Sequence, residues 1–210
     1  MMQILLATNN PGKVREIRAL IEELAPAYRE QISLILPLDM GIHLDVAEDG
    51  KTYAENAARK AAAFCRASHL ITLADDSGLE VTALGGEPGL HSHRYSPSPN
   101  ATDADRRAFL LRNLREHTRP WRARFVCTIA IATPEMRAFD PRLEYATGEC
   151  PGEIIPEERG SNGFGYDPIF LIKELDKTMA ELSTQEKNCY SHRSRALHNA
   201  VSILIRMINE

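Results

Sequence analysis

The first 24 residues restrict the fold most strongly, because an apolar strand runs into a polar loop and then into a helix. Residues 4–7 are Ile-Leu-Leu-Ala, and the loop Thr8-Asn9-Asn10-Pro11-Gly12-Lys13 follows at once. Apolar side chains then recur at helical spacing as far as residue 24. Asn10 suits the N-cap of this helix and Pro11 suits its first position, where the missing N–H costs nothing.

Strands and helices continue to alternate along the chain. We expect strands at residues 32–38, 70–74, 79–81, 123–133 and 143–148, and helices at 52–68, 102–117 and 197–208. The second helix opens with Thr52-Tyr53-Ala54-Glu55, the form of a capping box in which Glu55 accepts a hydrogen bond from the Thr52 N–H. The last two strands suit a hairpin. Early alternation with a late hairpin predicts an α/β fold with a mixed β-sheet.

Composition narrows the class of protein. The 210 residues suit one substantial domain or two small lobes with a shared core, and 43% hydrophobic and 26% charged residues are typical of a soluble globular chain. A net charge of -4 gives no basic field for a long nucleic acid. No stretch approaches the roughly 20 apolar residues of a membrane span, and the N-terminus lacks the pattern of a signal peptide. We therefore expect a cytoplasmic protein that contacts neither membrane nor nucleic acid.

The cysteines favour the same compartment. They are widely separated and include no C-x-x-C pair, which predicts buried thiols in a reducing environment in place of a disulfide frame or zinc site. They are Cys65, Cys127, Cys150 and Cys189.

The loop from Thr8 to Lys13 is suited to phosphate. It supplies a hydroxyl, two carboxamides, a glycine, a lysine and a helix N-terminus, all of which can hold phosphate oxygens. It is not a Walker loop, since only Gly12 precedes Lys13 and Val14 follows it. The alternative interpretation is a capped helix start with a solvated lysine.

Asp75-Asp76-Ser77-Gly78 follows an apolar strand and places two carboxylates side by side. That arrangement is costly unless a cation, a proton or a donor offsets the repulsion. Mg²⁺ fits, because it binds a few carboxylates together with phosphate oxygens and water, and a nearby carboxylate can act as general base. The alternative is a turn with one capping and one solvated aspartate. An aspartyl-nucleophile phosphatase is disfavoured, because it needs Asp-x-Asp.

Asn56 and Lys60 lie four residues apart and therefore share a helix face, where an amide and an ammonium can meet one anionic ligand. Their segment taken alone also suits an ordinary surface helix.

Two later segments can contact a ligand, the first a flat ligand and the second carbonyl oxygens or phosphates. In Gly160-Ser161-Asn162-Gly163-Phe164-Gly165-Tyr166-Asp167-Pro168, glycines flank an aromatic ring that can contact a base, and Asp167 can accept hydrogen bonds from a base or sugar. A hairpin turn with a packed phenylalanine is the alternative. Lys187, Ser191, His192 and Arg193 concentrate donors just before the last helix, where a solvated basic turn is equally possible. His192 and His198 are spaced wrongly for a zinc site.

Together and in order, these motifs resemble those of the inosine/xanthosine triphosphate pyrophosphatases. The resemblance runs from residue 3 to the last helix. The motifs are Thr8-Asn9-Asn10-Pro11-Gly12-Lys13, Glu55-Asn56-Ala57 with Lys60-Ala61, Asp75-Asp76-Ser77-Gly78-Leu79, Pro88-Gly89 with Ser92 and Arg94-Tyr95, Phe164-Gly165-Tyr166-Asp167-Pro168, and Ser191-His192-Arg193.

The resemblance implies a homodimeric α/β enzyme whose single domain, residues 1–210, has a long mixed sheet flanked by helices and two lobes with a nucleotide cleft between them. It implies Mg²⁺-dependent hydrolysis of ITP, dITP and XTP to the monophosphate and pyrophosphate. The implied phosphate-binding residues are Thr8, Asn9, Asn10, Pro11, Gly12 and Lys13, with Asn56 and Lys60. The implied general base and metal ligand is Asp76, and Ser77 touches the substrate. The implied base-binding residues are Phe164, Gly165, Tyr166, Asp167, Lys187, His192 and Arg193.

The chain departs from the family pattern at two places. Ala47 stands ahead of Glu48-Asp49-Gly50 where two acidic residues are frequent, so Glu48 is the candidate for a second metal carboxylate. His93 stands where a small residue is usual. Competing functions are a pyrophosphatase or phosphatase with another base preference, including pyrimidine triphosphates, and a nucleotide-binding sensor without turnover. A nucleic-acid-binding module is disfavoured by the net acidity.

Overall fold

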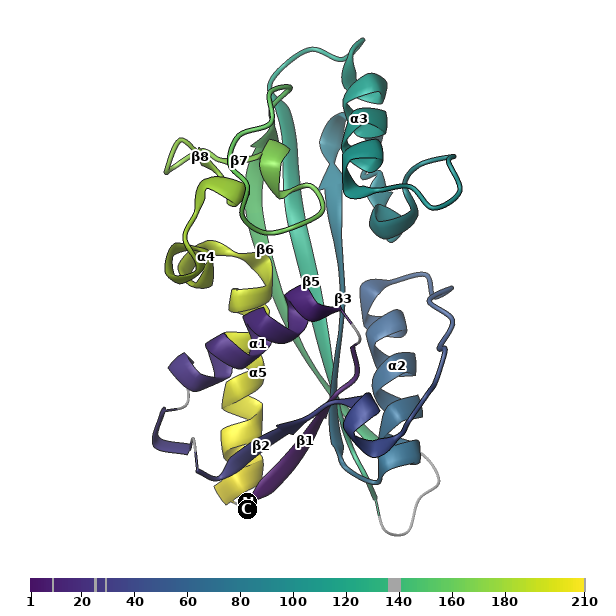
Figure 1. Ribbon diagram of the computed structural model, residues 1–210, viewed down its shortest axis with the longest axis vertical. Coiled ribbons are helices and arrows are strands. Elements are labelled where there is room, and N and C mark those ends of the chain that lie inside the picture. Colours follow the sequence, from purple (N-terminus) through teal and green to yellow (C-terminus); the bar gives the residue numbers. More distant parts are fainter. Residues whose placement is uncertain (9, 25, 29, 136–140, 210) are drawn as a thin grey trace. The chain divides into compact units, whose positions relative to one another are not determined.

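Strand β1 (Met2–Leu6) is the first of three parallel strands (Figure 1). It pairs with β2 (Ile32–Ile35) on one side and with β3 (Ile71–Val81) on the other, and Ile4 lies opposite both Leu34 and Ile71. The computed structural model describes residues 1–8, 10–24, 26–28, 30–135 and 141–209.

Within the described ranges, eight strands form one sheet in the order β2-β1-β3-β5-β6-β7-β8, with β4 paired to β3. Antiparallel pairs β3·β4, β6·β7 and β7·β8 join the parallel ones, so the predicted α/β fold with a mixed sheet is confirmed. The remaining strands are β4 (Pro88–Gly89), β5 (Trp121–Thr133), β6 (Arg142–Ile154), β7 (Phe170–Ile172) and β8 (Lys177–Thr178). The α-helices are α1 (Pro11–Leu24), α2 (Tyr53–Ser68), α3 (Asp103–Leu114), α4 (Thr184–Tyr190) and α5 (His192–Asn209).

The chain forms two compact units. The first unit comprises residues 1–76, 127–148 and 193–210, and the second comprises residues 77–126 and 149–192. Strands β3, β5 and β6 each run from one unit into the other, so neither unit is a continuous stretch of sequence.

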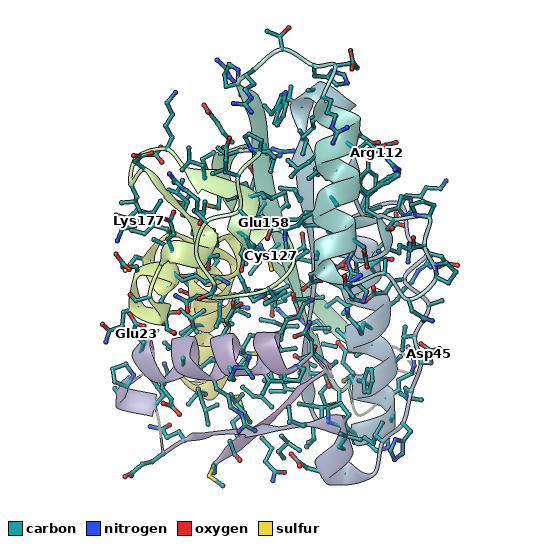
Figure 2. All side chains as sticks on the ribbon, turned by 45° about the horizontal axis from the view of Figure 1, so that its top comes forward. Glu23, Asp45, Arg112, Cys127, Glu158 and Lys177 are labelled. Atoms are coloured by element: carbon teal, nitrogen blue, oxygen red, sulfur yellow. The ribbon has the colours of Figure 1, made fainter. Side chains whose placement is uncertain are left out.

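The core of the first unit has two layers because neighbouring strand residues face opposite sides of the sheet. Ile4, Leu6 and Leu73 pack with apolar residues of α1 and α5. Leu5 and Ala74, each next in sequence to one of these, pack with α2. Cys127, labelled in Figure 2, is fully buried in the α1 and α5 layer. Position 75 therefore faces α1 and α5, and position 76 faces α2.

The core of the second unit gathers β3, β5 and β6 against α3 and the segment around β7. Its fully buried side chains include Leu79, Leu110, Leu114, Ile169 and Phe170. No helix in the described part of the chain is long and apolar enough to cross a membrane.

Several local predictions are correct and others are wrong. Helix α2 begins after Thr52, whose hydroxyl accepts a hydrogen bond from the Glu55 N–H at 3.1 Å. The reciprocal bond of the capping box is not the predicted one, because the Glu55 carboxylate accepts from the Lys51 N–H at 2.8 Å. Residues 75–78 do not form a turn but continue β3, which is one strand of 11 residues. Helix α4 was not expected.

The cysteine prediction holds for three of the four thiols. Cys65, Cys127 and Cys150 are buried and Cys189 is exposed, and none of these four described cysteines is in a disulfide. Cys189 lies on α4 two residues after the buried Lys187, and positions two apart on a helix point in different directions.

Candidate functional site

The start of α1 confirms the predicted cap. The Asn10 Oδ1 accepts hydrogen bonds from the N–H groups of Gly12 at 2.8 Å and Lys13 at 3.2 Å, and the Thr8 Oγ1 accepts from the Asn10 N–H at 3.2 Å. Pro11 occupies the first helical position. Asn9 lies outside the described residues. Two N–H groups of the helix start are therefore already engaged by the Asn10 side chain.

Lys13 belongs to a network of charged side chains. Its Nζ lies 2.8 Å from the Oδ2 of Asp75, and the same oxygen lies 3.5 Å from the Nε of Arg193. Arg193 also pairs with Glu16 of α1. Asp75 and Arg193 have side chains only 1% and 3% exposed, so their charges interact with little screening by water. Arg193 thus lies in the first unit beside Asp75.

The surroundings hold Asp75 in its charged form. Burial alone raises the pKa of this carboxyl, but the charges of Lys13, Arg193 and Lys60 outweigh burial and hold the pKa well below its usual range. Asp75 therefore has no capacity to take up a proton near neutral pH.

Asp76 faces α2 and has a different environment. Its Oδ2 accepts a hydrogen bond from the Asn56 Nδ2 at 2.9 Å, and the Asn56 Oδ1 accepts from the Gly50 N–H at 2.8 Å. A Cβ at Gly50 would lie 2.6 Å from that Asn56 oxygen, so the position requires glycine. Asn56 is 1% exposed and serves to hold and orient the Asp76 carboxylate.

The pKa of Asp76 is raised, in contrast to that of its neighbour. Burial is the largest cause, and the negative charge of Glu48 adds to it against the opposing effects of Asn56 and Lys60. When their environments separate their pKa values, adjacent carboxyls are suited to different roles. One is suited to be a structural anion and the other a proton acceptor. Of the two, Asp76 has the environment suited to accepting a proton.

Lys60 and Glu48 complete the cluster in the first unit. The Lys60 Nζ donates to the Glu48 carboxylate, and Lys60 also feels the charges of Asp75 and Asp76. Burial lowers the pKa of Lys60, but these anions outweigh it, and the pKa lies above its usual value. Asn56 and Lys60 do share a helix face as predicted, and both contact carboxylates.

The second unit brings together another group of predicted residues. The Asp167 Oδ2 accepts hydrogen bonds from the Phe164 N–H at 3.0 Å and from the Lys187 Nζ at 2.8 Å. The Lys187 Nζ also lies 5.3 Å from the centre of the Phe164 ring. Asp167 and Lys187 are buried, whereas Phe164 is half-buried. The ion pair therefore supports an aromatic ring that solvent can reach.

Glycines and a helix fix the turn that carries Phe164. Gly163 has φ +77°, and a Cβ there would clash with the Asp167 carboxylate. The Gly165 N–H donates to the Asp103 Oδ2 at 2.8 Å, and its carbonyl accepts from the Arg107 Nη1 at 2.8 Å. Arg107 is itself held by Glu158, labelled in Figure 2.

Tyr166 and His192 have buried positions. The Tyr166 hydroxyl donates to the Ser92 carbonyl at 2.9 Å, and burial raises the pKa of this phenol far above its usual value. The His192 ring stacks on Phe125 with ring centres 4.7 Å apart and planes at 14°. Tyr166 therefore anchors the turn through its hydroxyl, and His192 is oriented by stacking.

The predicted residues thus fall into two groups. The first unit holds Thr8, Asn10, Pro11, Gly12, Lys13, Glu48, Asn56, Lys60, Asp76 and Arg193, and the second holds Ser77, Phe164, Gly165, Tyr166, Asp167, Lys187 and His192. Ser77 lies half-buried in β3, directly after Asp76.

Sequence reasoning missed four supporting residues, which are Glu16, Asp103, Arg107 and Phe125. Asp103 and Arg107 lie four apart on one helix and hold the two sides of Gly165, so their spacing was a usable signal. Glu16 and Phe125 had no local signal, because their partners are distant in sequence.

The chain belongs to the Ham1 family, whose model matches residues 4–203. It is 45% identical over 197 residues to the dITP/XTP pyrophosphatase of Thermus thermophilus, covering 93% of this chain and 88% of the relative. It is 43% identical over 207 residues to the dITP/XTP pyrophosphatase of Desulforamulus reducens, covering 98% and 97%. The solved structure of a Ham1 protein from Coxiella burnetii matches with a TM-score of 0.85 and 39% identity, covering 98% of this chain and 100% of that one.

Proposed function

We propose that this protein hydrolyses non-standard purine nucleoside triphosphates, ITP, dITP and XTP, to the nucleoside monophosphate and pyrophosphate, with Mg²⁺. The opposite environments of Asp75 and Asp76 carry the proposal, because they provide a fixed anion and a proton acceptor on adjacent residues. The relatives named dITP/XTP pyrophosphatase support the choice of substrate.

The first unit supplies the phosphate chemistry. Water attacks the α-phosphorus, its proton passes to the Asp76 carboxylate, and the bond between the α-phosphorus and the bridging oxygen breaks as pyrophosphate leaves. Asn56 orients the acceptor, and Lys13 and Lys60 offset the charge of the phosphate chain.

The donor set of the first unit fits Mg²⁺. Asp76 and Glu48 provide two carboxylates, and burial together with the charge of Glu48 raises the pKa of Asp76. Mg²⁺ is commonly held by one or two carboxylates together with phosphate oxygens and water. When bound, Mg²⁺ would neutralise phosphate charge and lower the pKa of attacking water.

The second unit supplies base recognition. The half-buried Phe164 ring gives a stacking surface, and Lys187 and His192 are cationic or N–H donors suited to a 6-oxo group. Adenine presents a 6-amino donor in place of that acceptor, and a site that leaves buried donors unpaired discriminates by about 10⁴ to 10⁵. Arg193, paired with Asp75, contributes to base recognition only if it is displaced from that pair.

The same proposal includes a homodimer that acts in the cytoplasm. Its support is the resemblance of the ordered motifs to the inosine/xanthosine triphosphate pyrophosphatases.

The test is incubation of the purified protein with ITP, dITP, XTP, ATP, GTP and dUTP, with Mg²⁺ or with chelator. Products are resolved as monophosphate plus pyrophosphate or as diphosphate plus phosphate. We expect monophosphate and pyrophosphate from ITP, dITP and XTP, little product from ATP, and none in chelator. Diphosphate as product, or equal turnover of all bases, contradicts the proposal.

A further inference from the structure

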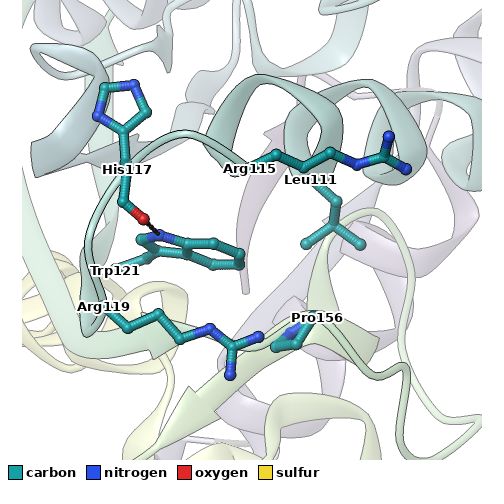
Figure 3. A pocket seen from close by; sticks show the side chains of 6 residues that line it. All are labelled: Leu111, Arg115, His117, Arg119, Trp121 and Pro156. Atoms are coloured by element: carbon teal, nitrogen blue, oxygen red, sulfur yellow. Dashed lines mark hydrogen bonds between the residues drawn. The ribbon is translucent and has the colours of Figure 1, made fainter.

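The second unit contains a cavity built from residues that have no part in the proposed hydrolysis. Its volume is about 420 Å³, within the range of pockets that hold small organic ligands. It lies where α3 ends and β5 begins (Figure 3). The lining residues are Leu111, Arg115, His117, Arg119, Trp121 and Pro156.

The indole of Trp121 fixes one wall of this cavity. Trp121 is only 5% exposed, and its Nε1 donates to the His117 carbonyl at 2.9 Å. The Arg119 guanidinium carbon lies 4.9 Å from the indole centre, a cation–π contact that restrains the guanidinium. In Figure 3 the His117 ring points away from the indole, so this residue contributes its carbonyl.

Two guanidinium groups give the cavity an excess of positive charge. Figure 3 shows Arg115 and Arg119 on opposite sides of the indole, with both guanidinium groups toward the end where Leu111 and Pro156 lie. Among the described residues neither arginine forms an ion pair, and no acidic side chain lines the cavity. Arg107 and Arg124 in the same unit are both paired with glutamates. Positive charge is therefore available to a ligand here, in a chain of net charge -4.

We propose that this cavity is a second anion site, separate from the proposed substrate groups, that binds an organic phosphate of about nucleoside monophosphate size. Guanidinium groups match phosphate oxygens in paired hydrogen bonds, and Arg119 is already restrained by the indole. The volume exceeds what one phosphate group fills, and Leu111 and Pro156 provide an apolar wall for the organic part.

Tryptophan fluorescence tests this site directly, because Trp121 is the only tryptophan in the chain. The intact protein is titrated with inorganic phosphate, ribose 5-phosphate and inosine monophosphate, with excitation at the red edge of tryptophan absorption. We expect a saturable change with both organic phosphates, at concentrations at least about tenfold below any change with inorganic phosphate, a difference of about 1.4 kcal/mol.

Variants of two arginines test whether the fluorescence change comes from binding in this cavity. Arg115→Gln removes a charge without touching the indole and should weaken binding about tenfold or more, while retaining ITP hydrolysis. Arg112→Gln is the control, because Arg112 lies on α3, three residues before Arg115, with its guanidinium over Phe109, and does not line the cavity. Equal loss in both variants overturns the proposal.

The variant Phe164→Ala distinguishes the cavity from the proposed substrate site. It should leave the fluorescence titration unchanged. Loss of the response in Phe164→Ala with retention in Arg115→Gln overturns the proposal, since the signal then comes from the base-binding group. A response to a single-stranded oligonucleotide but to neither organic phosphate also overturns it. Failure of ITP hydrolysis leaves these outcomes unaffected, so the two proposals fail separately.

Discussion

Each unit contains a lysine–aspartate pair with the same 2.8 Å separation, but the two pairs have different surroundings. Lys13 and Asp75 in the first unit lie among further charges from Arg193 and Lys60. Lys187 and Asp167 in the second unit hold the backbone and ring of Phe164. The first pair belongs to a network of charges, and the second fixes the turn that carries Phe164.

The difference indicates which kind of ligand group each pair is suited to meet. A network of several cations and anions sets the protonation of Asp76 and can meet a highly charged phosphate chain. A pair that fixes an aromatic ring can meet a nearly neutral base. The same ion pair therefore contributes electrostatics in one unit and geometry in the other.

The largest expected effect is on turnover. Asp76→Asn keeps the size of the side chain and its contact with Asn56 but removes the proton acceptor, so the rate of ITP hydrolysis should fall by about 10² to 10⁴. Asp49→Asn is the control, because Asp49 is an exposed carboxylate of the same segment that pairs with Arg59. Full turnover of Asp76→Asn shows that the base lies elsewhere.

The same variant should not lose stability. Because the pKa of Asp76 is raised in the folded protein, its favourable contribution is present below the unfolded value of 3.8 and is lost as the pH rises through the folded value. The ionised carboxylate therefore opposes folding near neutral pH. Urea unfolding of Asp76→Asn at neutral pH should give a midpoint equal to or above that of the wild type.

Asp75→Asn should destabilise the protein by about 3 to 5 kcal/mol, because it leaves the buried Arg193 and the half-buried Lys13 without their common anion. The pKa of Asp75 is depressed, so its contribution is present above the unfolded value of 3.8 and is lost as the pH falls below it. The stability of the variant should therefore change less than that of the wild type below that pH. Glu149→Gln, which removes an exposed partner of Arg124, should change stability by at most about 1 kcal/mol.

Asp167→Asn should cost about 1 to 3 kcal/mol in urea unfolding, because one ammonium loses its charged partner while the Phe164 N–H keeps an acceptor. The KM for ITP should rise more than kcat falls. A loss of stability larger than that of Asp75→Asn would remove the distinction between the two pairs.

The smallest expected effect is a difference between two glycine variants. Gly85→Ala and Gly163→Ala both place a side chain at positive φ, +65° and +77°, which costs about 1 to 2 kcal/mol. Only the Gly163 Cβ would meet the Asp167 carboxylate, since nothing lies within 4 Å of a Cβ at Gly85. Gly163→Ala should therefore be less stable than Gly85→Ala by about 1 kcal/mol. Equal unfolding midpoints would show that the turn adapts.

Local signals predicted part of this architecture correctly. The Asn10 cap and the start of α2 follow from residues close in sequence, and both are confirmed. The continuity of β3 through Gly78 was missed, because glycine and aspartates favour a turn. In the structure β3 pairs with β1 over residues 71–73 and with β4 at Leu79 and Glu80, on either side of this segment.

The sequence predicted which residues belong to the candidate site but not which of them contact one another. The resemblance named both Asp76 and Arg193, yet no spacing rule places Arg193 beside Asp75 and Glu16, which are distant in sequence. The pKa contrast between Asp75 and Asp76 likewise depends on which face of β3 each side chain occupies.

The division of the chain into interleaved segments has a consequence for synthesis on the ribosome. The second unit is complete once residue 192 has emerged, whereas the first unit waits for α5, which supplies Ala196, Leu197 and Leu204 to its core. Until α5 has been made, the apolar faces of β1, β3 and β5 beneath that helix remain uncovered, the condition in which nascent chains aggregate or recruit chaperones. A premature stop shortly before α5 therefore leaves β1 without a finished core.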